Sequence, residues 1–135
     1  MMKIYRPLWS EGVFLSPEQF QQQGFWESYT NQQIAKLTLA NAWGVECLLL
    51  DIPAFQINRL SVSEVAIRFN DGTVIDSKIA DALPPSRDLI KDIPTDLDQV
   101  TVFLALPLLR AQGGNCSFDS QDLERPLRYR RQWAD

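Results

Sequence analysis

The 135-residue sequence predicts a mainly β fold, an antiparallel β-sandwich with one N-terminal α-helix packed against it. Three observations lead to this class. A capped, helix-compatible segment comes first, short apolar runs with strand alternation follow it, and connections rich in glycine or proline separate those runs. The runs lie too close together for the long crossovers that parallel strands need, so antiparallel pairing is expected.

The helix is predicted to begin at Pro17 and to run to about Leu39. Ser16 suits the N-cap, proline suits the first helical position, and Gln19 completes a Ser-x-x-Gln capping box. The apolar residues of this helix do not form a single stripe, which indicates contact with protein on more than one side. A row of glutamines either lies at such a contact or forms a solvated face.

The strands are predicted from short apolar runs and turn residues. Residues 45–52 form an apolar run ended by Pro53, which is typical of a well-buried strand. Residues 60–69 alternate, but the apolar parity shifts by one at Ser63 and Glu64, so we expect a β-bulge or a break there. Residues 70–72, Asn-Asp-Gly, predict a hairpin turn, with residues 73–76 as the returning strand.

The second half of the chain gives weaker signals. Residues 82–98 carry three prolines among charges and predict a long surface connection. Residues 100–106 predict another strand, and Gly113 with Gly114 marks a turn. From residue 119 onward we expect a charged tail, whose basic cluster either is solvated, leads into a further segment or stacks on RNA: Arg125, Arg128, Tyr129, Arg130, Arg131 and Trp133.

Composition predicts one domain, residues 1–135, of an ordinary globular kind: 45% of the residues are hydrophobic and 22% charged. No apolar run approaches the roughly 18 residues of a membrane span, and the first residues lack the apolar part of a signal peptide, so a cytoplasmic location is expected. The net charge of −4 argues against nucleic acid as a partner. Cys47 and Cys116 are expected to be free thiols.

The sequence contains no histidine, the commonest general base and metal ligand. It also lacks a nucleophile elbow and a phosphate-binding glycine loop. We therefore predict no enzyme activity, no cofactor and no metal. A glycosidase that uses two carboxylates is the enzymatic alternative, although acids at strand ends commonly serve turns. Its candidate residues would be Asp51, Glu64, Asp71 and Asp76.

Residues 9–23, WSEGVFLSPEQFQQQ, fit neither a catalytic motif nor an ordinary amphipathic helix. Aromatic side chains with polar neighbours are where interface energy concentrates, so this segment indicates protein docking. We expect Trp9, Phe14 and Phe20 to pack, and the acid and glutamines to lie nearer a partner. The candidate partner-binding residues are Trp9, Glu11, Gly12, Phe14, Leu15, Gln19, Phe20, Gln22, Gln23 and Trp26.

Residues 5–23, YRPLWSEGVFLSPEQFQQQ, resemble the N-terminal signature of the TssK family, the baseplate adaptor subunits of bacterial type VI secretion systems. Further segments agree in order along the chain: NAWGV at 41–45, RFNDGTVIDS at 68–77, ADALPPSRDL at 80–89, FLALPLLRAQGGN at 103–115 and ERPLRY at 124–129. Many members have Pro-x-His-Phe where this chain has Pro17-Glu18-Gln19-Phe20, so no role of that histidine is carried over.

The resemblance implies that the chain is the N-terminal shoulder domain of such an adaptor, a β-sandwich similar to the shoulder domain of siphophage receptor-binding proteins. In this family the shoulder attaches a trimeric adaptor to a baseplate wedge of TssF, TssG and TssE near the inner membrane. A neck and a head, which faces the TssJLM membrane complex, lie outside these residues. The alternative function is a glycan-binding β-sandwich module of the receptor-binding type.

Overall fold

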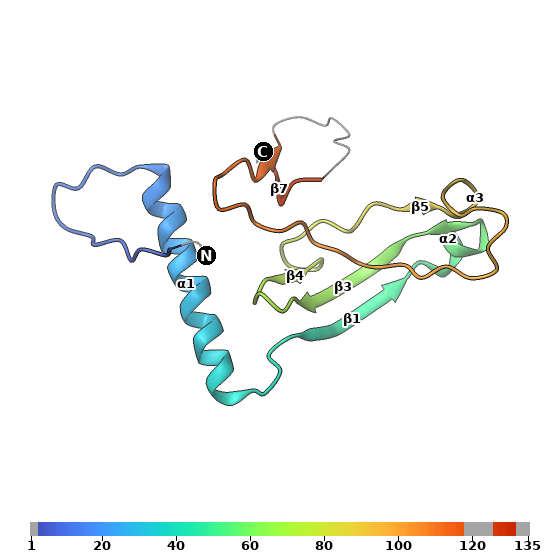
Figure 1. The fold of residues 1–135 in the computed structure, drawn as a ribbon, viewed down its shortest axis with the longest axis horizontal. Coiled ribbons are helices and arrows are strands. Elements are labelled where there is room, and N and C mark those ends of the chain that lie inside the picture. Colours follow the sequence, from blue (N-terminus) through green and yellow to red (C-terminus); the bar gives the residue numbers. More distant parts are fainter. Residues whose placement is uncertain (1–2, 118–125, 132–135) are drawn as a thin grey trace. The chain divides into compact units, whose positions relative to one another are not determined.

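The computed structural model describes residues 3–117 and 126–131 (Figure 1). The chain divides into two compact units, one formed by residues 4–98 and the other by residues 1–3 together with 99–135. The first unit contains one long helix and two small antiparallel sheets, and the second contains a pair of very short strands.

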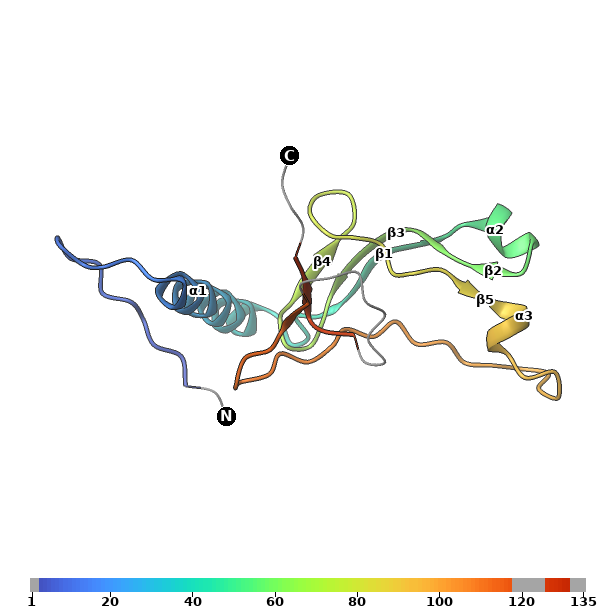
Figure 2. The ribbon, with the colours of Figure 1, turned by 90° about the horizontal axis from the view of Figure 1, so that it is seen from above.

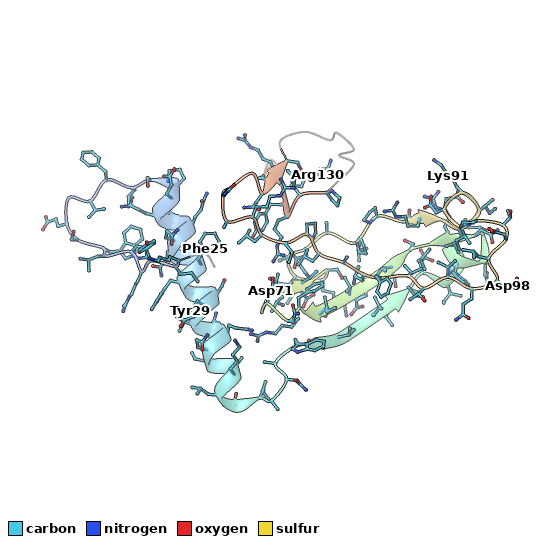
Figure 3. The ribbon with its side chains drawn as sticks, viewed as in Figure 1. Phe25, Tyr29, Asp71, Lys91, Asp98 and Arg130 are labelled. Atoms are coloured by element: carbon cyan, nitrogen blue, oxygen red, sulfur yellow. The ribbon has the colours of Figure 1, made fainter. Side chains whose placement is uncertain are left out.

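Helix α1 spans Pro17–Thr38, as the capping signals predict. Ser16 is the N-cap residue, and its backbone amide donates to Oε1 of Gln19 at 3.0 Å. The amide of Leu39 still donates to the carbonyl of Ala35 at 3.0 Å, so the helix ends where the pattern indicates. No residue of α1 is buried, and Phe25 and Tyr29 project from it one turn apart (Figure 3).

The largest sheet has the strand order β1-β3-β4, with β1 at Gly44–Leu50, β3 at Val62–Arg68 and β4 at Val74–Asp76. Both pairings are antiparallel. In the central strand, Val65 is only 2% exposed, and it is the one fully buried apolar side chain among the described residues. Its amide donates to Oγ of Ser77 at 3.0 Å, which ties the residues after β4 back to the sheet.

The predicted bulge lies at Ser63. Leu49 pairs with Glu64 and Leu50 pairs with Val62, so Ser63 is the extra residue on β3. Its hydroxyl donates to the carbonyl of Leu49 at 3.1 Å, across the irregularity. The bulge explains why the apolar parity shifts within one continuous strand, because an extra residue moves later side chains to the opposite face.

The Asn-Asp-Gly hairpin is confirmed, and it is also where α1 meets the sheet. Gly72 has φ +88° and its amide donates to the carbonyl of Phe69 at 2.9 Å. Gln32 of α1 accepts from Nη2 of Arg68 at 2.8 Å and donates to the carbonyl of Asn70 at 3.4 Å. A polar side chain therefore makes hydrogen bonds between the helix and the end of the hairpin.

Two Gly→Ala substitutions are expected to act in opposite directions. At Gly72 the positive φ is strained for alanine and the new Cβ would collide with the amide of Gln32, so we expect a loss of about 1–2 kcal/mol. At Gly24, inside α1, nothing lies near the new Cβ, and we expect a gain of up to about 1 kcal/mol. Urea denaturation measures the change in the free energy of unfolding of both variants. Changes of the same sign in the two variants would contradict this prediction.

A second antiparallel pair joins β2, Arg59–Leu60, to β5, Arg87–Asp88. Two short helices that the sequence analysis missed flank this pair. The run predicted as strand 45–52 ends at Leu50. A short helix, α2, spans Ile52–Gln56 instead, with Pro53 in its first turn and Oδ1 of Asp51 accepting from the amide of Ala54 at 3.0 Å.

The other short helix, α3, spans Leu89–Asp92 within the segment predicted as an irregular connection. Oδ1 of Asp88 accepts from the amides of Ile90 and Lys91 at 3.0 and 3.2 Å. The carboxylate satisfies amides that otherwise have no helical partner, and this cap explains a single turn of helix within a proline-rich connection.

In the second unit, β6 at Cys116–Ser117 pairs in parallel with β7 at Tyr129–Arg130. The predicted strand at residues 100–106 is wrong: these residues take no strand pairing, because their apolar, β-branched sequence has no neighbouring strand to bond to. The predicted turn is present, with Gly113 at φ +87° and Gly114 at φ +70°.

The predicted class, mainly β with antiparallel sheets and one long N-terminal helix, is confirmed (Figure 1). The likeness to the phage shoulder domain stays a prediction. The predicted basic tail falls mostly outside the described residues, including Arg125 and Trp133. Within the described part of it, Nη1 of Arg128 donates to the carbonyl of Pro107 at 2.9 Å.

Candidate functional site

The residues before α1 form a strap, residues 5–9, and a loop, residues 10–15, that leads into the helix (Figures 1 and 2). The loop turns at Ser10, whose carbonyl accepts from the amide of Val13 at 3.3 Å. Gly12 occupies the third position of this turn with φ +80°, the value that a type II turn requires there. Glycine is thus needed for the backbone conformation rather than for space.

The strap is held along the first half of α1. The amide of Tyr5 donates to Oε1 of Gln22 at 3.1 Å, and Nε1 of Trp9 donates to Oε1 of Gln23 at 3.4 Å. The guanidinium of Arg6 lies over the ring of Trp26, 5.8 Å from its centroid. These contacts join residues 5–9 to residues 22–26, within the first half of the helix.

These contacts correct the prediction of which residues pack and which face a partner. Gln19, Gln22 and Gln23 were expected to face a partner, but each of them accepts a hydrogen bond from residues 5–16 of this chain. Phe14 was expected to pack, yet it is 94% exposed. The sequence could not reveal that the glutamines would make internal hydrogen bonds while Phe14 stays exposed, because these roles depend on how the strap folds back onto the helix.

The strap and the loop carry several exposed side chains. Leu8 is 86% exposed and Leu15 65%, beside the more exposed Phe14. Glu11 is also exposed. Sequence reasoning missed Leu8, although an apolar residue set between Pro7 and Trp9 was a signal for it. Large apolar side chains exposed within eight successive residues of the chain favour a site of protein contact.

Trp9 and Phe20 were also expected to pack, yet they are 46% and 58% exposed, so their ring contacts cover only part of each side chain. The rings of Trp9 and Phe20 lie 5.9 Å apart between centroids, and those of Trp26 and Tyr29 lie 5.8 Å apart. Aromatic pairs at this spacing attract one another. The region therefore combines exposed aliphatic and phenyl groups with two pairs of aromatic rings.

An open groove of about 230 Å³ separates the strap from the helix and is lined by Tyr5, Pro7, Leu8, Glu18, Gln19 and Gln22. At its edge, hydrogen bonds from its own backbone amide and from the hydroxyl of Ser16 lower the pKa of Glu18. The carboxylate therefore stays ionised near the start of the helix, where the helix dipole favours a negative charge.

A second open groove, of about 250 Å³, lies at the end of β1 and is lined by Trp43, Gly44, Val45, Ile67, Arg68, Phe69 and Asn70. Trp43 is 61% exposed beside it. An exposed indole next to polar backbone is the arrangement in which aromatic rings can stack on sugars, so this groove is the place that a glycan would use.

The four acids considered for a glycosidase all have structural partners. Asp51 caps α2, and Oδ1 of Asp71 accepts from the amide of Thr73 at 2.9 Å. Oδ1 of Asp76 accepts from the amide of Lys78 at 2.9 Å, and Glu64 forms an ion pair with Nζ of Lys78 at 2.7 Å. Caps, turns and an ion pair account for these carboxylates without a catalytic role.

Glu64 also accepts a hydrogen bond from Sγ of Cys47, at 3.3 Å across β1 and β3. This bond is the main cause that raises the pKa of the Cys47 thiol, and the bond from Lys78 is the main cause that lowers the pKa of Glu64. Because the pKa of Glu64 is lowered in the folded chain, its contribution to stability is present above its ordinary pKa and is lost as the pH falls through the lowered value.

We expect Glu64→Gln to accelerate alkylation of Cys47 at about pH 8, because removing the carboxylate allows a larger thiolate fraction. Iodoacetamide labelling in a Cys116→Ser background reports on Cys47 alone. Glu46→Gln is the matched control: Glu46 raises the pKa of the same thiol only through its more distant charge, so the acceleration should be smaller. Equal rates in all three chains would show that Glu64 does not control this thiol.

Within residues 3–117 and 126–131, no cluster of acids and cysteines could hold a metal ion. The same residues include no helix with the length and hydropathy needed to cross a membrane.

Comparison with protein families matches residues 19–135 to the family described as "Bacterial Type VI secretion, VC_A0110, EvfL, ImpJ, VasE". No curated protein matches the chain.

Several solved structures are similar to it. A chain of the type VI secretion TssK-TssF-TssG baseplate subcomplex is 44% identical over 96% of this chain, with a TM-score of 0.86. A chain of the type VI secretion baseplate complex is 41% identical over 95%, with a TM-score of 0.77. TssK from the EAEC system, in complex with a nanobody, is 39% identical over 84%, with a TM-score of 0.71. The chain spans 42%, 40% and 39% of these three chains.

Proposed function

Because the chain belongs to the bacterial type VI secretion family of VasE and ImpJ, we propose that it is a structural adaptor domain that docks onto TssF and TssG in the baseplate. The observation that carries the proposal is the likeness, at 44% identity, to a chain of the TssK-TssF-TssG subcomplex. In this proposal the chain is the N-terminal shoulder domain of a TssK-like adaptor, and it has no enzymatic role.

The exposed loop is the part of the surface that we assign to docking. Its apolar side chains Phe14 and Leu15, with Leu8 of the strap, would supply the buried centre of an interface, and Glu11 would lie at its rim. The other candidate residues hold the strap and the loop in this proposal: Gly12 forms the turn, and the rest make the hydrogen bonds and ring contacts with α1, namely Trp9, Gln19, Phe20, Gln22, Gln23 and Trp26.

The remaining features of the proposal follow the resemblance to the TssK family. The full-length adaptor would be a trimer, with TssE beside TssF and TssG in the wedge, at a cytoplasmic baseplate near the inner membrane. Contact with the TssJLM membrane complex would be made by parts of the adaptor outside this chain. The absence of histidine and the structural partners of the four acids agree with a role without catalysis.

Co-expression with TssF and TssG tests the proposal directly. We expect the chain to co-purify with the TssF–TssG complex through affinity and size-exclusion steps. A folded chain that never co-purifies with these proteins would show that this domain is not sufficient for docking.

A glycan-binding module is the second candidate, and the exposed Trp43 beside its groove is the observation in its favour. Binding on a glycan array that is lost in Trp43→Ala would support it. An array without signal would remove the glycan-binding candidate and leave the adaptor function as the one proposed.

A further inference from the structure

Gln23 stands in the middle of a hydrogen-bonded relay. Its Oε1 accepts from Nε1 of Trp9 at 3.4 Å, and its Nε2 donates to Oε1 of Glu27 at 2.8 Å. The indole nitrogen can only donate, and an ionised carboxylate can only accept. A side chain between them must therefore accept at one end and donate at the other, which the amide of glutamine does.

The relay matters because little burial holds the loop in place. Leu8, Phe14 and Leu15 are exposed, and α1 has no buried residue. The position of the loop then depends on the contacts that hold the strap on the helix, which are the bonds to Gln22 and Gln23 and the two ring contacts of Arg6 and Trp9. Trp9 directly precedes the turn that begins at Ser10, so its bond to Gln23 is the strap–helix hydrogen bond nearest the N-terminal end of the loop.

We infer that the Trp9–Gln23–Glu27 relay positions the loop at residues 10–15 for its protein partner. Gln23 and Glu27 are positioning residues that need not touch that partner. The relay lowers the entropic cost of ordering the loop on binding, because the loop is already held in one arrangement. The part of this inference that concerns affinity rests on the proposed docking to TssF and TssG.

Exchanging the side chains of Gln23 and Glu27 provides the test. In Gln23→Glu the new carboxylate still accepts from Trp9 but faces Glu27, and like charges four residues apart on a helix repel. We expect amide hydrogen exchange of residues 5–15, followed by mass spectrometry, to become about threefold to tenfold faster, the effect of one net hydrogen bond. Adding Glu27→Gln restores a donor opposite the new acceptor, so exchange should return to the original rate.

Gln21→Glu is the matched control, since it makes the same change two positions away on the exposed surface of α1. It should leave exchange of residues 5–15 unchanged. Unaltered exchange in Gln23→Glu, or no recovery in the double variant, would overturn the relay.

Affinity for the TssF–TssG complex, measured on the same variants, separates the two proposals. If the loop positions a docking surface, affinity falls in Gln23→Glu and recovers in the double variant. Faster exchange with unchanged affinity would uphold the relay but overturn its role in docking. Unaltered exchange would overturn the relay whatever the affinity.

Discussion

Phe14→Ala is expected to weaken binding to the TssF–TssG complex by about 10-fold to 100-fold, as the loss of a central interface aromatic does. Phe14 is 94% exposed in the chain, so its removal should change the free energy of unfolding by no more than about 0.5 kcal/mol. The same side chain would lose most of its exposure on docking. Biolayer interferometry with immobilised TssF–TssG and thermal denaturation of the free chain measure the two quantities.

Phe103→Ala is the chemically matched control for this experiment. Phe103 is 82% exposed but belongs to the second unit of the chain, far along the sequence from the loop. We expect its removal to leave the affinity unchanged. A loss of affinity that is equal in both variants would point to general hydrophobic contact, and a native affinity in Phe14→Ala would remove the loop from the docking surface.

The second large effect concerns stability, and Val65→Asp is expected to abolish cooperative folding of the sheet. Val65 is 2% exposed in the central strand, and an ionised carboxylate placed there loses its hydration without gaining a partner, at a cost of several kcal/mol. Val65→Ala, which only leaves a cavity, should cost about 2 kcal/mol and keep the fold. Circular dichroism in a urea series measures both.

Val74→Asp is the control within the same sheet. Val74 is 60% exposed in β4 and pairs with Arg68 of β3. The new carboxylate would stay hydrated, so the expected loss is at most about 1 kcal/mol, the range of strand propensity. Similar losses at Val65 and Val74 would show that the centre of the sheet is not where the fold is stabilised.

The scarcity of buried residues bears on function. Large apolar side chains are exposed on β1 as well as on the loop, among them Leu48 and Leu49 at 46% and 51%. A stable monomeric domain usually covers such strands with another layer of structure. The exposure agrees with a domain that completes its burial in an assembly, which is the role proposed for it.

The local elements of the fold could be predicted because short-range contacts specify them. Ser16 and Gln19 lie within one turn of each other, Ser63 shifts the parity of its own strand, and Asn70 to Gly72 form a turn by themselves. The short helices α2 and α3 were missed although they have the same kind of local cap. There, Pro53 and the prolines of residues 82–98 were interpreted only as residues that end regular structure. An aspartate directly precedes each helix, Asp51 before α2 and Asp88 before α3, and an aspartate in that position can start a helix.

In the candidate site, less could be predicted from the sequence than in the fold. The segment at residues 9–23 could be singled out from its composition, but the roles of its residues could not be assigned. Gln22 and Gln23 face the strap, and Phe14 faces solvent, because the strap folds back onto α1. Residues 100–106 have the composition of a strand without becoming one, because a strand also needs a bonded neighbour.

The beginning of the long helix, the bulge in the central strand, the hairpin turn and the family resemblance can all be recognised from the residues alone. Which side chains hold the loop, and which stay exposed, depends on how the chain folds back on itself. The two kinds of property differ in the distance along the chain over which they are set. Caps, turns and bulges depend on neighbouring residues, whereas the bonds from Tyr5 and Trp9 to the glutamines of α1 join residues 17 and 14 positions apart.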